Sequence, residues 1–248
     1  MQTFVIDFET SGNTAGHVPA QVACAVLDAD GAVTRRFVTY IQGPTYLDPW
    51  VRSNLPHLTL EKCNVGMTFA DAMAMAFDGV QPGDTIVAHN AGFDVHKIMR
   101  NNAAKAPMAA EALKHCKVAC TMNSTTNFCK LAQPPRSRRP GFKWPKLTEL
   151  AAKLKIDTRD MQLHDAAADV ELTRMCLDKL AELGLYSHAT GQFDEVVGTT
   201  SAASTKSKSA PAAVTSKGSA RLPARKPAAR FKLPPVVLDE VFGHTSAQ

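Results

Sequence analysis

Three things that the sequence lacks limit what this protein can be. No uninterrupted apolar run approaches the roughly 18 residues that a membrane-spanning helix needs, although apolar residues make up 45% of the chain. The first apolar segment begins almost at residue 1, which leaves no room for the charged and then apolar regions of a signal peptide. Cys116, Cys120 and Cys129 have no fourth Cys or His at the spacing that would complete a zinc site. We therefore expect a cytoplasmic protein with no membrane partner, whose six cysteines are mostly reduced core residues.

Large apolar residues are scarce in the C-terminal part of the chain. Residues 198–230 are mostly Ala, Ser, Thr, Lys and Pro, which cannot bury enough surface to fold. Residues 198–248 contain five Lys and three Arg against two acids, so they carry +6, and residues 1–197 carry −1. Such a tail suits nucleic acid or another acidic partner, and it also favours solubility. We predict a folded domain at 1–185, a flexible basic linker at 186–230 and a short apolar segment at 231–248 that docks a partner.

The first segment with strand character carries two acids inside an apolar run. In Phe4–Thr10, side chains alternate between the two faces of the strand, so Asp7 and Glu9 point to the same side. Two carboxylates that share one face of a buried strand repel each other unless a cation neutralises them. Mg²⁺ and Mn²⁺ take such oxygen ligands. The alternative is an edge strand with two solvated acids, and this stretch by itself leaves both open.

The rest of the folded part alternates between strand and helix patterns. Two further strands joined by a turn should complete an antiparallel meander with the first. Prolines make the segment 43–66 irregular, and Thr68 is placed to cap the helix that follows it. This pattern predicts an α/β fold. The expected strands are 21–27, 32–40, 85–88 and 118–120, and the expected helices are 69–77, 94–104, 121–131, 147–154 and 164–183.

Two polar clusters stand next to these elements. His89 to Asp94 follow the short buried strand 85–88, where α/β proteins often place functional residues. An isolated Asp94 at this point could equally be a helix N-cap. His164 to Asp169 open the last long helix, which can direct Asp169 inward while the His lies over the same cavity. Each cluster is a weak signal alone, and the combination with Asp7 and Glu9 is stronger.

A third segment, 133–146, is rich in proline and cations. Its cations are interleaved with Phe142 and Trp144, which suits contacts to backbone phosphates and stacking on bases. A solvated loop whose Trp144 packs on the body is the equal alternative. The candidate substrate-binding cations are Arg136, Arg138, Arg139 and Lys143.

Three motifs, in this order, resemble those of the DEDDh 3′-5′ exonucleases, the group that includes the proofreading epsilon subunit of bacterial DNA polymerase III. The resemblance covers roughly residues 2–183 and implies an α/β, ribonuclease H-like fold. Its mixed sheet combines an antiparallel meander of three strands with parallel strands and is flanked by helices, and a disordered C-terminal tail follows. The motifs are Asp7-Phe8-Glu9-Thr10, His89-Asn90-Ala91-Gly92-Phe93-Asp94 and His164-Asp165-Ala166-Ala167-Ala168-Asp169.

The resemblance also implies a role for each motif residue. Four acids would bind two divalent ions, Mg²⁺ or Mn²⁺, with Asp7 between them, and His164 would act as the general base for the attacking water. Other motif residues would line or support the nucleotide site. The implied metal ligands are Asp7, Glu9, Asp94 and Asp169, and the implied substrate-binding residues are Thr10, Phe8, Phe93 and Asn90.

The expected activity is release of 5′-mononucleotides from the 3′ end of single-stranded DNA, in proofreading, replication or repair. A replication polymerase is the expected partner of the apolar residues 231–242, by similarity to the epsilon-like layout. The first alternative is a free-standing exonuclease that trims DNA or RNA ends. The second is an inactive ribonuclease H-like binding module, which is disfavoured because all four acids and His164 are present.

Overall fold

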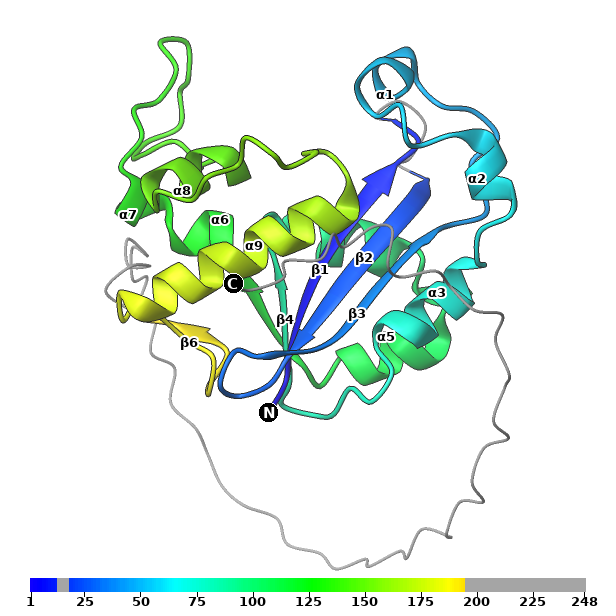
Figure 1. Ribbon diagram of the computed structural model, residues 1–248, viewed down its shortest axis with the longest axis horizontal. Helices are drawn as coiled ribbons and strands as arrows, with labels where there is room; N and C mark the ends of the chain where they lie inside the picture. The colour runs from blue at the N-terminus through cyan, green and yellow to red at the C-terminus, as the bar shows by residue number, and fades with distance from the viewer. Residues whose placement is uncertain (13–17, 195–248) are drawn as a thin grey trace, which may run out of the picture. The chain divides into compact units, whose positions relative to one another are not determined.

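A mixed five-stranded sheet forms the centre of the fold. The computed structural model describes residues 1–12 and 18–194, and the strand order is β3-β2-β1-β4-β5 (Figure 1). β1 pairs antiparallel with β2, and β2 with β3, whereas β4 and β5 run parallel to β1. The predicted meander with added parallel strands is therefore confirmed. The strands are β1 (Thr3–Thr10), β2 (Pro19–Leu27), β3 (Val33–Tyr40), β4 (Thr85–Ala88) and β5 (Lys117–Cys120).

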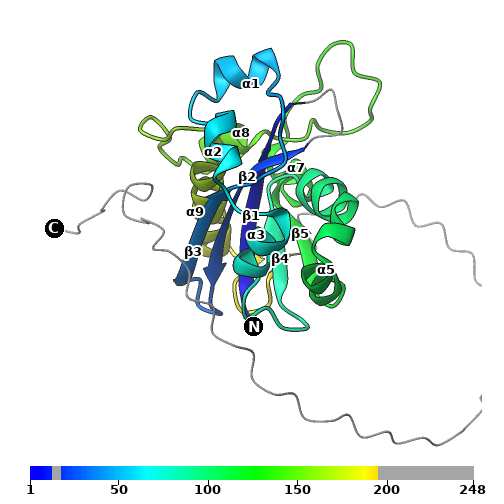
Figure 2. The same cartoon turned by 90° about the vertical axis from the view of Figure 1, so that its right-hand side faces the viewer.

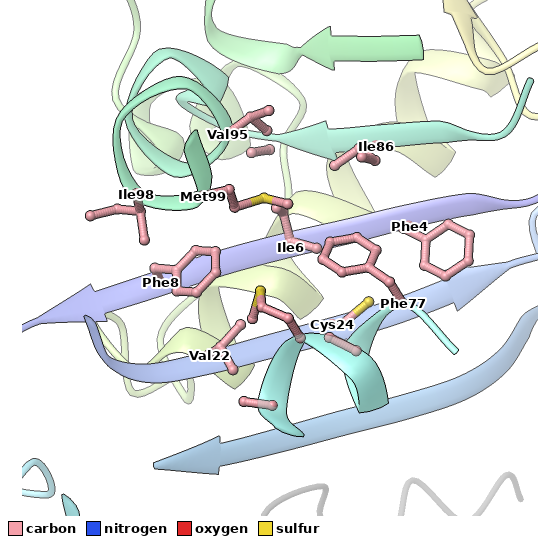
Figure 3. Close-up of a cluster of buried hydrophobic side chains, with 14 of the residues drawn as sticks. Phe4, Ile6, Phe8, Val22, Cys24, Phe77, Ile86, Val95, Ile98 and Met99 are labelled. Atoms are coloured by element: carbon pink, nitrogen blue, oxygen red, sulfur yellow. The ribbon is translucent and has the colours of Figure 1, made fainter. Parts of the chain in front are cut away.

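One face of β1 belongs to the hydrophobic core. Phe4, Ile6 and Phe8 lie in a cluster with side chains of α3 (Phe69–Ala76) and of the π-helical turn η1 (Asp94–Met99) (Figure 3). The Phe8 ring stacks on Phe69 with 6.4 Å between the ring centroids. Burial of each such side chain contributes about 1.5–3 kcal/mol. The alternation of strand side chains then turns Asp7 and Glu9 to the opposite face.

The opposite face of the sheet is covered by α9 (Ala166–Glu182), which contacts β1 and β2 (Figures 1 and 2). Leu172, Cys176, Leu177 and Leu180 of this helix are fully buried. α8 (Leu147–Lys153) packs against α9. The two acids of β1 therefore face the helix that carries Asp169.

The segment that was expected to be irregular contains two short helices, α1 (Pro49–Asn54) and α2 (Leu60–Asn64). Pro49 occupies the first turn of α1, where its missing N–H costs no hydrogen bond, so this proline starts a helix. Thr59 caps α2, and Thr68 caps α3 as predicted, by accepting a hydrogen bond from the Asp71 N–H at 3.1 Å.

The helix after β4 begins earlier than the sequence suggested. It starts as α4 (Ala91–Phe93), with Asn90 as its N-cap, and continues into η1. The N-cap interpretation of Asp94 is therefore wrong, because this residue lies one turn inside the helical segment. The remaining short helices are η2 (Ala103–Lys105), α5 (Pro107–Leu113), α6 (Thr121–Ser124) and α7 (Thr126–Cys129), and α5 was not predicted.

A small hairpin follows α9 where the sequence placed the start of the linker. β6 (Tyr186–Ser187) pairs with β7 (Gln192–Phe193), and the Tyr186 ring is buried against His188 and Phe193. Strands this short escape pattern-based prediction because they have no period to detect. The rest of the predicted linker and the segment 231–248 lie outside the described residues.

Within the described ranges, no helix has both the length and the apolar character needed to cross a bilayer. Four cysteines are buried, as expected for core residues, whereas Cys116 and Cys120 are half-buried.

Candidate active site

Four carboxylates converge where β1 extends beyond its neighbour β4. The parallel pairing of these strands ends at Val5 and Val87, because the chain turns into α4 soon after. Further along β1, the Phe8 N–H donates instead to Asp94 Oδ1 at 3.1 Å. This bond fixes Asp94 beside the acid pair of β1, and Asp169 reaches the same place from the first turn of α9.

Burial and mutual repulsion dominate the electrostatics of the cluster. Burial, followed by the charges of Asp94 and Asp169, raises the pKa of Asp7 well above its usual value. Burial and neighbouring acids, Asp169 first, raise the pKa of Glu9 to about 9. Burial raises the pKa of Asp94 to about 7, although the Phe8 N–H opposes the shift. Burial raises the pKa of Asp169 to about 6 against the opposing effect of His164. In the metal-free protein these carboxylates cannot all ionise at neutral pH without a large cost.

The donor set fits a hard divalent cation. Carboxylate oxygens are the ligands that Mg²⁺ and Mn²⁺ prefer, and a cation would remove the repulsion that raises each pKa. Potential ligand atoms of Glu9, His164 and Asp169 all lie within 4.8 Å of one another. Asp7 and Glu9 are on β1, Asp169 is on α9, and Asp94 is on η1, where the Phe8 N–H holds its carboxylate.

These pKa shifts predict how metal and pH control stability. The folded pKa values of Glu9 (about 9) and Asp94 (about 7) exceed the values of about 4 in an unfolded chain. From pH 6.5 to 8 the folded protein therefore holds more protons than the unfolded one, and its stability falls as pH rises. Buried His89, whose pKa burial lowers to about 4, opposes this fall near pH 6.5, where an unfolded histidine still binds about half a proton, and has almost no effect by pH 8. Thermal denaturation in EDTA should give a melting temperature that falls over this range, and Mn²⁺ should remove the fall.

A Glu9→Gln variant is the matched control for that measurement. In EDTA its melting temperature should fall less steeply from pH 6.5 to 8 than that of wild type, because the variant lacks one of the titrating carboxylates. A melting temperature that rises from pH 6.5 to 8 in EDTA would contradict the assignment of these acids as an uncompensated cluster.

His164 lies at the open side of the acid cluster. Its backbone has a left-handed φ of 65°, which is uncommon for a residue with a side chain. The backbone N–H of His164 donates to Asp169 Oδ1 at 3.4 Å, and His164 is exposed. An accessible imidazole beside the carboxylates can accept a proton from a water molecule bound there.

A hydrogen-bonded clamp at the start of α9 was not foreseen from the sequence. Asp165 caps this helix through the Ala167 N–H at 2.9 Å. The amide of buried Gln21, on β2, donates to Asp165 Oδ2 and accepts from the Ala166 N–H, both at 3.2 Å. His57 Nε2 also lies 3.2 Å from Asp165 Oδ2. The one feature of the sequence that could have indicated this clamp is Gln21 itself, a glutamine inside the otherwise apolar strand β2.

This clamp predicts that Gln21 positions the helix that carries Asp169. In Gln21→Leu the Ala166 N–H and the Asp165 carboxylate each lose a partner, which should lower the free energy of unfolding by about 1–3 kcal/mol. The kcat of the expected exonuclease reaction should fall by about 10- to 100-fold, as for other residues that orient ligands. Urea denaturation and steady-state kinetics measure the two effects, with exposed Gln81→Leu as the control. Wild-type stability in Gln21→Leu would contradict the clamp.

The residues predicted to bind substrate differ in exposure and in the face of the sheet on which their side chains lie. Thr10 follows a bulge at the end of β1, and Asn90 is exposed with its carbonyl accepting from the Phe93 N–H at 2.7 Å. Phe93 is half-buried, and the Lys97 ammonium lies 5.8 Å from its ring centroid. The Phe8 side chain is in the core on the other face, and its N–H bonds Asp94 at the site. A contact between Phe8 and substrate stays a prediction.

The cationic segment 133–146 forms a loop between α7 and α8. The Arg139 guanidinium lies 3.6 Å from the centroid of the half-exposed Trp144 ring. Lys143 pairs with Glu149, which also accepts from the Lys146 N–H at the start of α8. Arg136 and Arg138 are exposed. At the buried end of the loop, the Pro145 carbonyl oxygen lies 3.0 Å from His89 Nε2, and this hydrogen bond holds the loop to the domain.

Comparisons with known proteins agree with this architecture. The model of the RNase_T family, described as exonuclease, matches residues 4–175. No curated protein sequence matches the chain. Among solved structures, Escherichia coli exonuclease I in complex with a dA16 oligonucleotide is 19% identical, with a TM-score of 0.56 over 73% of this chain and 41% of that one. A moderately thermophilic exonuclease I from Methylocaldum szegediense is 17% identical, with a TM-score of 0.57 over 73% and 40%.

A zinc-bound form of the E. coli exonuclease I complex with single-stranded DNA is similar to the same extent, with 20% identity and a TM-score of 0.56 over 73% and 40%. At these identities the likeness establishes the fold, and it confirms the ribonuclease H-like arrangement of the mixed sheet. The chain spans about two fifths of the length of the exonuclease I chains.

Proposed function

Because the chain belongs to the RNase_T exonuclease family, we propose that it removes 5′-mononucleotides from the 3′ end of single-stranded DNA in a metal-dependent reaction. The observation that carries this proposal is the convergence of Asp7, Glu9, Asp94 and Asp169, with raised pKa values, beside His164. The similar exonuclease I structures contain single-stranded DNA, which supports the choice of substrate.

The four acids would hold two divalent ions, Mg²⁺ or Mn²⁺. When bound, such ions supply the positive charge that lets an anionic phosphodiester approach and that stabilises the attacking and leaving oxygens. Asp7 is the proposed shared ligand, because it lies between Glu9 on its own strand and Asp94, which is held by the next residue, Phe8. His164 accepts the proton of the attacking water, and its position next to Asp169 keeps the imidazole at the site.

Oligonucleotides labelled at one end test this proposal. A 5′-labelled DNA strand should shorten one nucleotide at a time from its 3′ end in Mg²⁺ or Mn²⁺, and EDTA should stop the reaction. A duplex and an RNA of the same sequence, digested in parallel, distinguish a DNA exonuclease from the alternative of an enzyme that trims RNA ends. Absence of cleavage of every substrate with either metal would favour the inactive binding module.

The loop 133–146 is the proposed contact for the nucleic acid backbone. The exposed Arg136 and Arg138 suit phosphates, whereas Lys143 is already neutralised by Glu149. Changing both arginines to Gln should therefore reduce the slope of log affinity against log salt by about 1.4, since each lost contact to a single strand contributes about 0.7. Lys143→Gln is the matched control and should leave this slope nearly unchanged. Equal slopes for all variants, measured by fluorescence anisotropy, would place the backbone contact elsewhere.

A role in proofreading, beside a replication polymerase, is the finer part of the proposal. It depends on residues 231–242, where an apolar cluster contains Asp239 and Glu240 after a basic segment. We propose that this cluster recruits the partner. Pull-downs with the full chain and with a variant lacking 231–242 test it, and recovery of the same replication proteins by both would contradict it.

A further inference from the structure

Helix α1 is anchored on one side and carries an exposed tryptophan on the other. Leu47, Val51 and Leu55 are at most 4% exposed and pack in a small core with Ala20 of β2. Trp50, on the same helix, is 55% exposed. Large aromatic side chains are usually buried, because their apolar area is costly to leave in water. Trp50 therefore presents a large aromatic surface from a well-anchored helix.

The start of α1 is fixed to the end of β1. The Asp48 N–H donates to the Ser11 carbonyl at 2.8 Å. Gly12 has a left-handed φ of 140°, and a Cβ atom on it would lie 2.0 Å from Asp48 Oδ2. Both contacts come directly after the strand that carries Asp7 and Glu9. Figures 1 and 2 show α1 at the end of the sheet toward which β1 points.

The Trp50 ring lies next to His164, which adjoins the acid cluster. Its centroid lies 6.1 Å from that of the His164 ring, and the two rings are nearly perpendicular, at 82°. Ligand atoms of His164 lie within 4.8 Å of those of Glu9 and Asp169. A phosphodiester bound at this cluster, with its divalent ions in place, would therefore have an adjoining nucleotide near the indole. An edge-to-face pair covers at most one face of the indole, which leaves room for another aromatic ring.

We propose that Trp50 is a substrate-binding residue that stacks on the base of the 3′-terminal nucleotide. The proposal rests on the exonuclease function proposed above and specifies how that site holds its substrate. Stacking on an aromatic side chain is tolerant of sequence, because every base has a π face. Trp50 thereby holds the terminal nucleotide of a single strand and disfavours an end whose base is paired in a duplex.

A cycle of enzyme and substrate changes tests this proposal. Wild type, Trp50→Phe and Trp50→Leu are compared on two oligonucleotides, one with a normal 3′-terminal nucleotide and one in which that nucleotide is abasic. With the normal strand, Trp50→Leu should lower kcat/KM by about 10-fold, mainly through KM, and Trp50→Phe should restore most of the loss. With the abasic strand, wild type and Trp50→Leu should be nearly equal.

A different outcome would show that Trp50 only holds His164 in place. In that case Trp50→Leu lowers kcat by the same factor on both strands and changes the pH profile, and the stacking proposal is wrong. Circular dichroism of Trp50→Leu and Trp50→Phe checks that both variants are folded. Failure of the exonuclease function itself is distinguishable, because wild type would then cleave neither strand.

Discussion

Asp7→Ala should abolish hydrolysis while leaving the protein folded. Asp7 lies at the centre of the carboxylate cluster, where Asp94, Asp169 and Glu9 all act on its charge. If Asp7 is the shared ligand of two ions, as proposed, its loss would weaken the stabilisation of both the attacking and the leaving oxygen, so we expect kcat to fall by about 10³-fold or more. Single-turnover digestion of a 5′-labelled strand in Mg²⁺ and in Mn²⁺ measures this loss.

Although Asp7→Ala should lose activity, it should be more stable than wild type when no metal is bound. In EDTA at neutral pH, Asp7→Ala removes a buried carboxylate that is repelled by its neighbours, so its melting temperature should rise above that of wild type. Mn²⁺ should stabilise wild type and have little effect on the variant. Asp30→Ala, in the exposed turn between β2 and β3, is the control and should change neither property. Undiminished hydrolysis by Asp7→Ala would overturn the assignment of the site.

His164→Ala should lower kcat by about 10²- to 10⁴-fold and leave a small, metal-dependent activity. A positioned general base contributes a factor of this size, and hydroxide from bulk water can replace it in part. The residual activity should therefore increase with pH over a range in which wild type has levelled off. Initial rates between pH 6 and 9 in Mg²⁺ measure both effects.

The left-handed backbone of His164 calls for a second variant. Alanine is disfavoured at φ 65°, so a loss of activity in His164→Ala could come from movement of the loop. Asparagine tolerates this conformation but cannot act as a general base at neutral pH. His164→Asn should be as inactive as His164→Ala. Near wild-type activity in His164→Asn would mean that the imidazole is not the base.

Much of the fold followed from local patterns. The strand over Phe4–Thr10 is confirmed, and so is the side on which Asp7 and Glu9 lie, because alternation along a strand depends only on near neighbours. The start of α3 was predicted for a similar reason, since the bond between Thr68 and the Asp71 N–H spans three residues. The start of the helix before Asp94 was missed because Asn90, a residue type that is favoured at N-caps, was interpreted only as part of the polar cluster after β4.

The features that could not be predicted from the sequence are contacts between parts of the chain that are distant in sequence. The acid pair, the order of the motifs and the cationic loop can be seen in the sequence, because each is a local arrangement of residue types. The clamp of Gln21 on the start of α9 and the place of Trp50 beside His164 depend on how β2, α1 and α9 pack together. No local pattern encodes such distances, since they result from the register of the sheet and the packing of helices on it. The sequence by itself therefore identified the residue types of the candidate site, and the positions of the groups that support them came from the tertiary structure.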